Sequence, residues 1–150
     1  MTPKQLTPKQ YLNQGYRLRD KIEMYNIELA KLRMTMDGMK SIQLEQDKIS
    51  SGRVESQVEN TVIKITVLME KIQKEIDHSI DLQTEIRDEI KAQPYLTETQ
   101  KMILHYRYVN FFRWDQICKE IHLESSQTYE LHRQALDHFM VPSKVRSKSE

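Results

Sequence analysis

Residues 114–140 read WDQICKEIHLESSQTYELHRQALDHFM, and this stretch decides the fold. Residues 114–121 have the pattern of a short helix, and residues 122–124, His-Leu-Glu, form a turn. Residues 125–140 then carry apolar side chains at the spacing of a longer helix. A short helix, a three- or four-residue turn and a further helix is the plan of a helix-turn-helix unit. We therefore expect an all-α chain that contains this unit.

The segment before this stretch predicts one more helix. Pro94 ends the preceding pattern, and Thr97-Glu98-Thr99-Gln100 is a capping-box sequence, which marks a helix start. Residues 110–113 break the pattern again. Residues 94–141 are therefore predicted to be a three-helix helix-turn-helix domain. The expected inward face of its first helix is Met102, Ile103, Tyr106 and Val109.

The N-terminal third of the chain has the pattern of a long helix. Thr7-Pro8-Lys9-Gln10 is a capping box with Pro at the first helical position. Behind it, apolar residues alternate in steps of four and three, the spacing of a coiled-coil seam. Asp37-Gly38 is predicted to end the helix, because Gly readily adopts the left-handed C-terminal cap. The seam residues are Leu18, Ile22, Tyr25, Leu29, Leu32, Met36 and Met39.

A second long helix is predicted for residues 54–92. Residues 40–53 are polar and are expected to be a connection, with a helical part around residues 42–49. The two polar seam positions, Ser79 and Gln83, weaken the seam locally. Together the two helices predict an antiparallel coiled-coil helical hairpin over residues 1–93. The seam of the second helix is Val58, Val62, Ile65, Met69, Ile72, Ile76, Ser79, Gln83, Ile86 and Ile90.

Both long helices also carry apolar residues outside their seams. A two-helix hairpin buries only one stripe on each helix, so the wider stripes predict packing against something more. That could be a second subunit, which gives a homodimer or higher homo-oligomer, or the C-terminal module. The residues outside the seams are Leu12, Met24, Ile27 and Met34 in the first helix, and Ile63, Val67, Leu68, Ile80 and Leu82 in the second.

The composition limits the compartment and the kind of core. The 150 residues include three Gly and four Pro, with 30% charged and 38% hydrophobic residues, which suits long helices with narrow seams. One Cys cannot form an internal disulfide, and the N-terminus lacks the apolar run of a signal peptide. No stretch is long and apolar enough to span a bilayer. We therefore expect a cytoplasmic protein with no membrane partner.

The sequence gives little indication of catalysis. It has no Gly-rich phosphate loop and no carboxylate pair that stands apart from the helical charge pattern. Cys118 and His122 are four residues apart, with His132 and His138 nearby in sequence, but zinc needs several such ligands to converge. Cys118 stands where a helix-turn-helix needs a small residue, and His132 falls on the packing face. We expect no enzyme activity, no metal and no cofactor.

The last helix can be divided by angle. Thr128, Leu131, His132, Ala135, Leu136 and Phe139 share one face and are expected to pack. The opposite face is expected to meet double-stranded DNA, because Gln and Arg are suitable readers of adenine and guanine. Four cations of the module, Lys101, Arg107, Arg113 and Lys119, are candidates for phosphate contacts. The candidate base-facing residues are Ser126, Gln127, Glu130, Arg133, Gln134 and Asp137.

Residues 96–140 resemble region four of bacterial sigma factors, and more closely the ArpU/RinA-like phage transcriptional regulators. The first helix ends in Arg107-Tyr108, the second begins with Trp114-Asp115-Gln116-Ile117, and the third contains Leu131-His132 and Ala135-Leu136. The upstream helices resemble that family's N-terminal half more weakly. The resemblance implies a prophage-encoded, sequence-specific DNA-binding transcriptional regulator, often of late genes.

Two departures from the family pattern and the charge balance leave an alternative function open. Glu124 stands where the family commonly has a capping Ser, and the acidic Glu130 lies in a helix that is usually more basic. Residues 94–150 hold eight Lys/Arg and seven Asp/Glu, a net charge of only +1. The alternative is a module that docks on RNA polymerase or another protein, with little DNA contact. Residues 142–150 are predicted to be a disordered basic tail.

Overall fold

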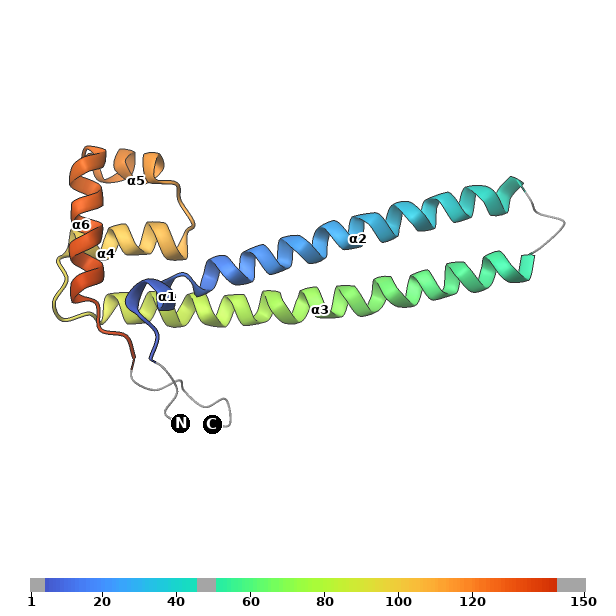
Figure 1. Ribbon diagram of the computed structural model, residues 1–150, viewed down its shortest axis with the longest axis horizontal. Helices are drawn as coiled ribbons and strands as arrows, with labels where there is room; N and C mark the ends of the chain where they lie inside the picture. The colour runs from blue at the N-terminus through green and yellow to red at the C-terminus, as the bar shows by residue number, and fades with distance from the viewer. Residues whose placement is uncertain (1–4, 46–50, 143–150) are drawn as a thin grey trace. The chain divides into compact units, whose positions relative to one another are not determined.

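The computed structural model describes residues 5–45 and 51–142 (Figure 1). Within these residues every regular element is helical, so the predicted all-α class is confirmed. Helix α5 has the predicted bounds, and α6 ends two residues earlier than expected. The elements are α1 (Pro8–Leu12), α2 (Gln14–Glu45), α3 (Ser51–Lys91), α4 (Glu98–Leu104), the π-helix η1 (His105–Val109), α5 (Trp114–Ile121) and α6 (Ser125–His138).

Contacts divide the chain into two compact units. The terminal unit combines residues up to Arg17 with residues from Ile80 onward, and the hairpin unit is Leu18–Ser79. The predicted domain boundary at residue 93 therefore falls inside the terminal unit, which also takes in the end of α3. Leu82, Ile86 and Ile90 of that helix end are buried. Whether residues 1–93 and 94–141 behave as separate domains stays a prediction.

The hairpin unit is built on part of the predicted seam. Leu29 of α2 is buried in one cluster with Ile65, Leu68 and Ile72 of α3, and other seam residues pack around it. The predicted seam of α3 is wrong at three positions, because Leu68, expected outside it, is buried, whereas Val62 and Met69 are 44% and 48% exposed. Lys21 pairs with Glu75 at 2.9 Å, whereas Thr61 lies 3.8 Å from the sulfur of Met39. The contact further along α2 is therefore made with a residue earlier in α3, so the two helices run antiparallel.

The predicted end of the first helix at Gly38 is wrong. Helix α2 continues without a break to Glu45, and α3 begins at Ser51, so the connection is shorter than residues 40–53. A Gly cap ends a helix by adopting a positive φ, and no glycine among the described residues does so. Residues 46–50, the middle of the predicted connection, lie outside the described residues.

In the terminal unit the predicted start of α4 is confirmed, but part of its inward face is wrong. Thr97 and Gln100 form the capping box, with hydrogen bonds of 3.0 and 3.2 Å. After Leu104 the chain forms one π-helical turn, in which the Asn110 amide donates to the carbonyl of His105 at 3.1 Å. The wider turn shifts the helical phase. Tyr108 is buried in this turn in place of Tyr106 and Val109, which are half-buried. In α4 itself Ile103 and Leu104 are buried, whereas Met102 is exposed.

Helix α6 is tied to the rest of the terminal unit at several points. It contacts α1, α4 and α5, and the ring of Phe139, just beyond its end, packs at a tilt against the ring of Tyr11 of α1, with centroids 5.9 Å apart. The buried amide of Gln93 accepts a hydrogen bond from the Met140 amide at 2.7 Å and donates to the Met140 carbonyl at 3.1 Å. No helix in the described part of the chain is long and apolar enough to cross a membrane.

Candidate functional site

The predicted helix-turn-helix is present in α5, α6 and the turn between them. Gln116 accepts a hydrogen bond from the Arg113 amide at 2.9 Å, which caps the start of α5. At its end, His122 adopts φ 57°, and the Leu123 amide donates to the carbonyl of Cys118 at 3.2 Å. A left-handed residue is a common C-terminal cap of a helix, and here it ends α5 so that α6 begins three residues later. The predicted turn at residues 122–124 is confirmed.

One face of α6 is fixed by buried contacts. Thr128 is fully buried, and its hydroxyl donates to the carbonyl of Glu124 at 2.9 Å while it accepts from the Cys118 thiol at 3.4 Å. Ala135, two turns later, is also fully buried. The predicted packing face is therefore confirmed for Thr128, Ala135 and Phe139, all of which are buried.

His132 joins α6 to the π-helical turn and to α5. Its Nε2 lies 2.7 Å from the Tyr108 hydroxyl, and its ring lies edge-on to the Trp114 ring with centroids 4.7 Å apart. Burial, and then the positive charges of Arg107 and Lys9, lower the pKa of His132 to about 4. The ring is therefore neutral at pH 7 and serves packing, as expected from its position on the inward face.

Arg107, a predicted phosphate contact, is used inside the unit. Its guanidinium donates to the carbonyl of Phe112 at 3.0 Å and lies 4.9 Å from the centre of the Trp114 ring and 5.4 Å from that of Tyr16. The Tyr16 hydroxyl in turn donates to the carbonyl of Arg107. These contacts hold the segment before α5 in place and leave Arg107 half-buried.

The N-terminal part of α6 presents an open, partly apolar groove. The exposed residues Ser126, Gln127 and Glu130 line it together with Leu123 from the turn and Leu131, which are half-buried. Gln127 also accepts a hydrogen bond from the Glu124 amide at 3.4 Å, so its amide helps to cap the helix. The structure thus brings three of the predicted base-facing residues to one surface, and adds two leucines.

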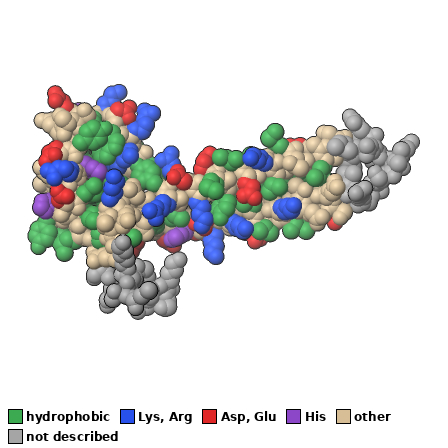
Figure 2. Space-filling model, in the orientation of Figure 1, with side chains coloured by type: hydrophobic (Ala, Val, Ile, Leu, Met, Phe, Trp, Pro, Cys, Tyr) green, Lys and Arg blue, Asp and Glu red, His purple; other side chains and the backbone are tan. Residues whose placement is uncertain are grey.

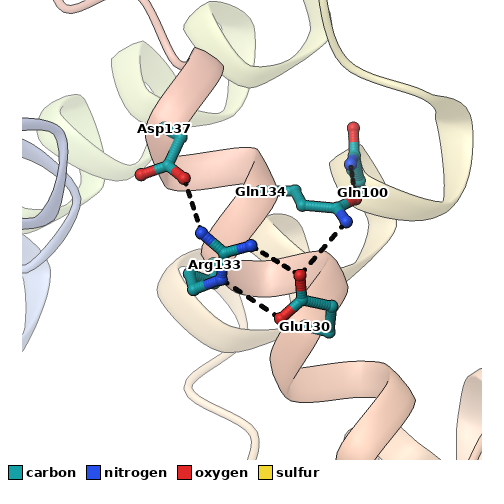
Figure 3. A network of polar contacts seen from close by, with 5 residues as sticks. All are labelled: Gln100, Glu130, Arg133, Gln134 and Asp137. Carbon is teal, nitrogen blue, oxygen red and sulfur yellow. Dashed lines mark hydrogen bonds and ion pairs between the residues drawn. The ribbon is translucent and has the colours of Figure 1, made fainter.

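Arg133 lies further along the same exposed surface and is paired with two carboxylates (Figure 3). Its guanidinium donates to both oxygens of Glu130, at 2.5 and 3.1 Å, and to Asp137 at 3.0 Å. The pairing lowers the pKa of Glu130, chiefly through the hydrogen bond from Arg133, and raises that of Arg133. Gln134 donates to Glu130 at 3.3 Å and accepts from Gln100 of α4 at 3.4 Å.

The remaining candidate cations have different surroundings. Lys101 donates to the carbonyl of Lys91 at 3.0 Å, near the end of α3, so its ammonium group is used within the fold. Arg113 is exposed at the start of α5, where it pairs with Asp115 at 3.3 Å. Lys119 is exposed in the last turn of α5. Arg113 and Lys119 are therefore the better placed for a phosphate contact.

Tyr129 is a candidate that the helical pattern did not single out. It is 49% exposed, one turn before Arg133, and its ring lies edge-on to the Trp114 ring with centroids 5.1 Å apart. An exposed aromatic ring held by a second ring can make a defined contact with a partner. The signal was weak because position 129 falls at the border between the two predicted faces of α6.

The electrostatic character of the terminal unit is mixed. On the side shown in Figure 2, Lys and Arg side chains are interspersed with Asp and Glu over this unit, with no large area of one sign. Among the described side chains, no three His, Cys, Asp or Glu residues come close enough together to hold a metal ion. The surface is suited to recognition by hydrogen bonds and local contacts, not to broad attraction of a polyanion.

Comparison with known proteins gives one family. Residues 38–139 match the family described as a protein of unknown function (DUF1492). This range includes α3, α4, α5 and α6, together with the last part of α2. No curated protein and no solved structure matches the chain.

Proposed function

This chain belongs to the DUF1492 family of proteins of unknown function, and we propose that it is a sequence-specific DNA-binding transcriptional regulator. The observation that carries the proposal is the α5–turn–α6 unit. Its second helix is anchored by Thr128, His132 and Ala135 and leaves a polar face exposed. A helix presented in this way fits the major groove of B-DNA. The resemblance to ArpU/RinA-like regulators supports the same reading and suggests a prophage origin.

In this proposal the first two turns of α6 enter the major groove. Residues near the N-terminus of a recognition helix contact base edges, and there Ser126 and Gln127 are exposed. The Gln127 amide can pair with adenine, and Tyr129 supplies an apolar edge for a thymine methyl group. Arg133 reaches a guanine or a phosphate once it exchanges its carboxylate partners. Arg113 and Lys119 contact phosphates from α5.

A second candidate function is docking on a protein, such as RNA polymerase. Two observations favour it. Arg133 is paired with Glu130 and Asp137, which makes this part of the exposed face net acidic, and the groove beside it has Leu123 and Leu131 in its lining. Phosphate repels an acidic surface, whereas a protein partner with apolar and basic side chains would be attracted by it.

Selection of binding sites from random DNA tests the proposal. We expect wild-type protein to enrich one sequence, and Gln127→Ala to lose preference at one base pair. Gln57→Ala, an exposed Gln on α3 in the hairpin unit, is the matched control and should leave the preference unchanged. If no sequence is enriched while the protein still retains RNA polymerase, the DNA-reading proposal fails and the docking function replaces it.

A further inference from the structure

The hairpin unit exposes large apolar side chains beyond those of its seam. On α2 Met24 is 68% exposed, and on α3 Ile63 and Val67 are 60% and 45% exposed. Figure 2 shows hydrophobic side chains between charged ones along the two long helices. An isolated exposed apolar residue is ordinary, but a contiguous group on one side of two paired helices is typical of an interaction surface.

The group becomes contiguous in a groove between the two helices. Glu28 and Leu32 of α2 line it on one side, and the floor includes Leu68 of the buried cluster. The α3 side is formed by Ile63, Lys64, Val67 and Lys71. Met24 lies one helical turn before Glu28, on the same side of α2. The groove thus has an apolar centre, a carboxylate on its α2 side and two ammonium groups on its α3 side.

We propose that this groove is where a second copy of the chain docks, so that two hairpins form a four-helix bundle. A two-fold axis that runs along the groove places α2 of each copy opposite α3 of the other. Glu28 of one copy then faces Lys64 and Lys71 of its partner, and the reverse pair forms at the same time. The apolar side chains at the centre, Ile63 and Val67, pack against their symmetry mates.

The charge pattern is what selects a second copy as the occupant. The groove carries opposite charges on its two sides, so it is complementary to itself after a two-fold rotation. A four-helix bundle buries a second apolar stripe of this kind, which a lone hairpin leaves in water. The inference concerns the hairpin unit alone and does not rest on DNA binding, because association is measured without DNA.

Sedimentation of the full chain over a range of concentrations is the first test. We expect wild type to associate, and the double variant Ile63→Lys with Val67→Lys to be a monomer. The matched control is Ile27→Lys with Met34→Lys. These two residues are 50% and 74% exposed on α2, and neither of them lines the groove. The control should associate as wild type does.

A charge exchange is the second test. Glu28→Lys alone should weaken association, because each new lysine faces Lys64 and Lys71 of the partner. The double variant Lys64→Glu with Lys71→Glu should also weaken association, because its new glutamates face Glu28 of the other copy. An equal mixture of the two proteins should associate again, since both inter-copy contacts are then attractive, and circular dichroism should show unchanged helix content in each variant.

Three results would overturn the proposal. One is a wild-type protein that stays monomeric at every concentration measured. Another is equal loss of association in the Ile27/Met34 control, which would mean that a different face is responsible. The third is a mixture of the charge variants that does not associate although each variant is folded.

Discussion

Tyr108 and His132, 24 residues apart, share a hydrogen bond of 2.7 Å, and their rings are stacked with centroids 5.7 Å apart. Tyr108 comes from the π-helical turn and His132 from the middle of α6. Burial raises the pKa of Tyr108 to about 12 and lowers that of His132 to about 4, so both side chains are neutral near pH 7. This contact holds the inward face of α6.

Replacing His132 should therefore destabilise the protein in a pH-dependent way. His132→Ala removes a partly buried ring and leaves the Tyr108 hydroxyl without its partner, which should cost about 1–3 kcal/mol at pH 7. The folded state binds the His132 proton less readily than the unfolded state, whose pKa is near 6.5. The neutral His132 ring therefore makes its full contribution to the free energy of unfolding above pH 6.5. This contribution is lost as the pH falls toward 4.

Urea unfolding of wild type and His132→Ala at several pH values checks this prediction. The difference in unfolding free energy should shrink by about 1–2 kcal/mol between pH 7 and 4, after allowance for solvent screening of a partly exposed ring. Tyr108→Phe is the control, because it removes only the hydroxyl and keeps the ring. A difference that does not change with pH would mean that His132 is not held neutral.

Two glycines of α2 should respond in opposite ways to the same substitution. A Cβ at Gly38 would meet no atom within 4 Å, so Gly38→Ala should stabilise the helix by about 0.5–1 kcal/mol. A Cβ at Gly15 would lie 3.2 Å from the Phe111 ring. Phe111 cannot yield easily, because it has φ 58° and its ring lies edge-on to that of Tyr16 with centroids 4.9 Å apart.

Gly15→Ala should therefore be destabilising in spite of its better helix propensity. Thermal unfolding of the two single variants measures both effects against the same wild type. A stabilising Gly15→Ala would show that Phe111 moves aside. In contrast, a destabilising Gly38→Ala would argue against a continuous helix through residue 38.

Helix limits set by local chemistry were predictable. The capping box at Thr97–Gln100 fixed the start of α4, and the bounds of α5 agreed with the sequence pattern. The predicted helix end at Gly38 was wrong because a glycine permits a left-handed cap without requiring one. The seam of α2 continues past it, with Met39 beside Thr61 of α3, and this tertiary contact outweighs a weak local preference.

The π-helical turn could not be predicted because it depends on distant residues. It brings Tyr108 to His132 and Arg107 to Trp114, and Tyr16 from the N-terminal region packs against Phe111 just after it. The pairing of Arg133 is different. Glu130 and Asp137 stand three residues before and four after it, a spacing at which helical side chains meet, so the sequence contained this contact.

The turn between α5 and α6 offers a stabilising substitution. His122 is a non-glycine residue at φ 57°, a conformation that is costly for a side chain with a Cβ. His122→Gly should stabilise the protein by about 1 kcal/mol if this strain is relieved. Thermal unfolding gives the sign, and Glu124→Gly, at an extended residue of the same turn, is the control that should not stabilise.

Glu130 should oppose DNA binding, because it neutralises Arg133 and repels phosphate. Glu130→Gln removes one of the two carboxylates that hold the guanidinium, and under the proposed function it should raise DNA affinity about two- to tenfold. If Arg133 then reaches a phosphate, the salt dependence of binding should steepen by about one unit. Asp137→Asn, which removes the negative charge of the carboxylate that accepts only one hydrogen bond from Arg133, should have a smaller effect.

A double-mutant cycle shows whether the gain in DNA affinity from Glu130→Gln depends on Arg133. DNA affinity is measured for wild type, Glu130→Gln, Arg133→Ala and the double variant, over a range of salt concentrations. Because the two side chains are in contact, their effects should not add, and the gain from Glu130→Gln should largely vanish without Arg133. A gain that persists in the Arg133→Ala background would reflect only the removal of a negative charge. A loss of affinity confined to one base pair would instead identify Glu130 as a reader of cytosine, with Arg133 as the residue that orients its carboxylate.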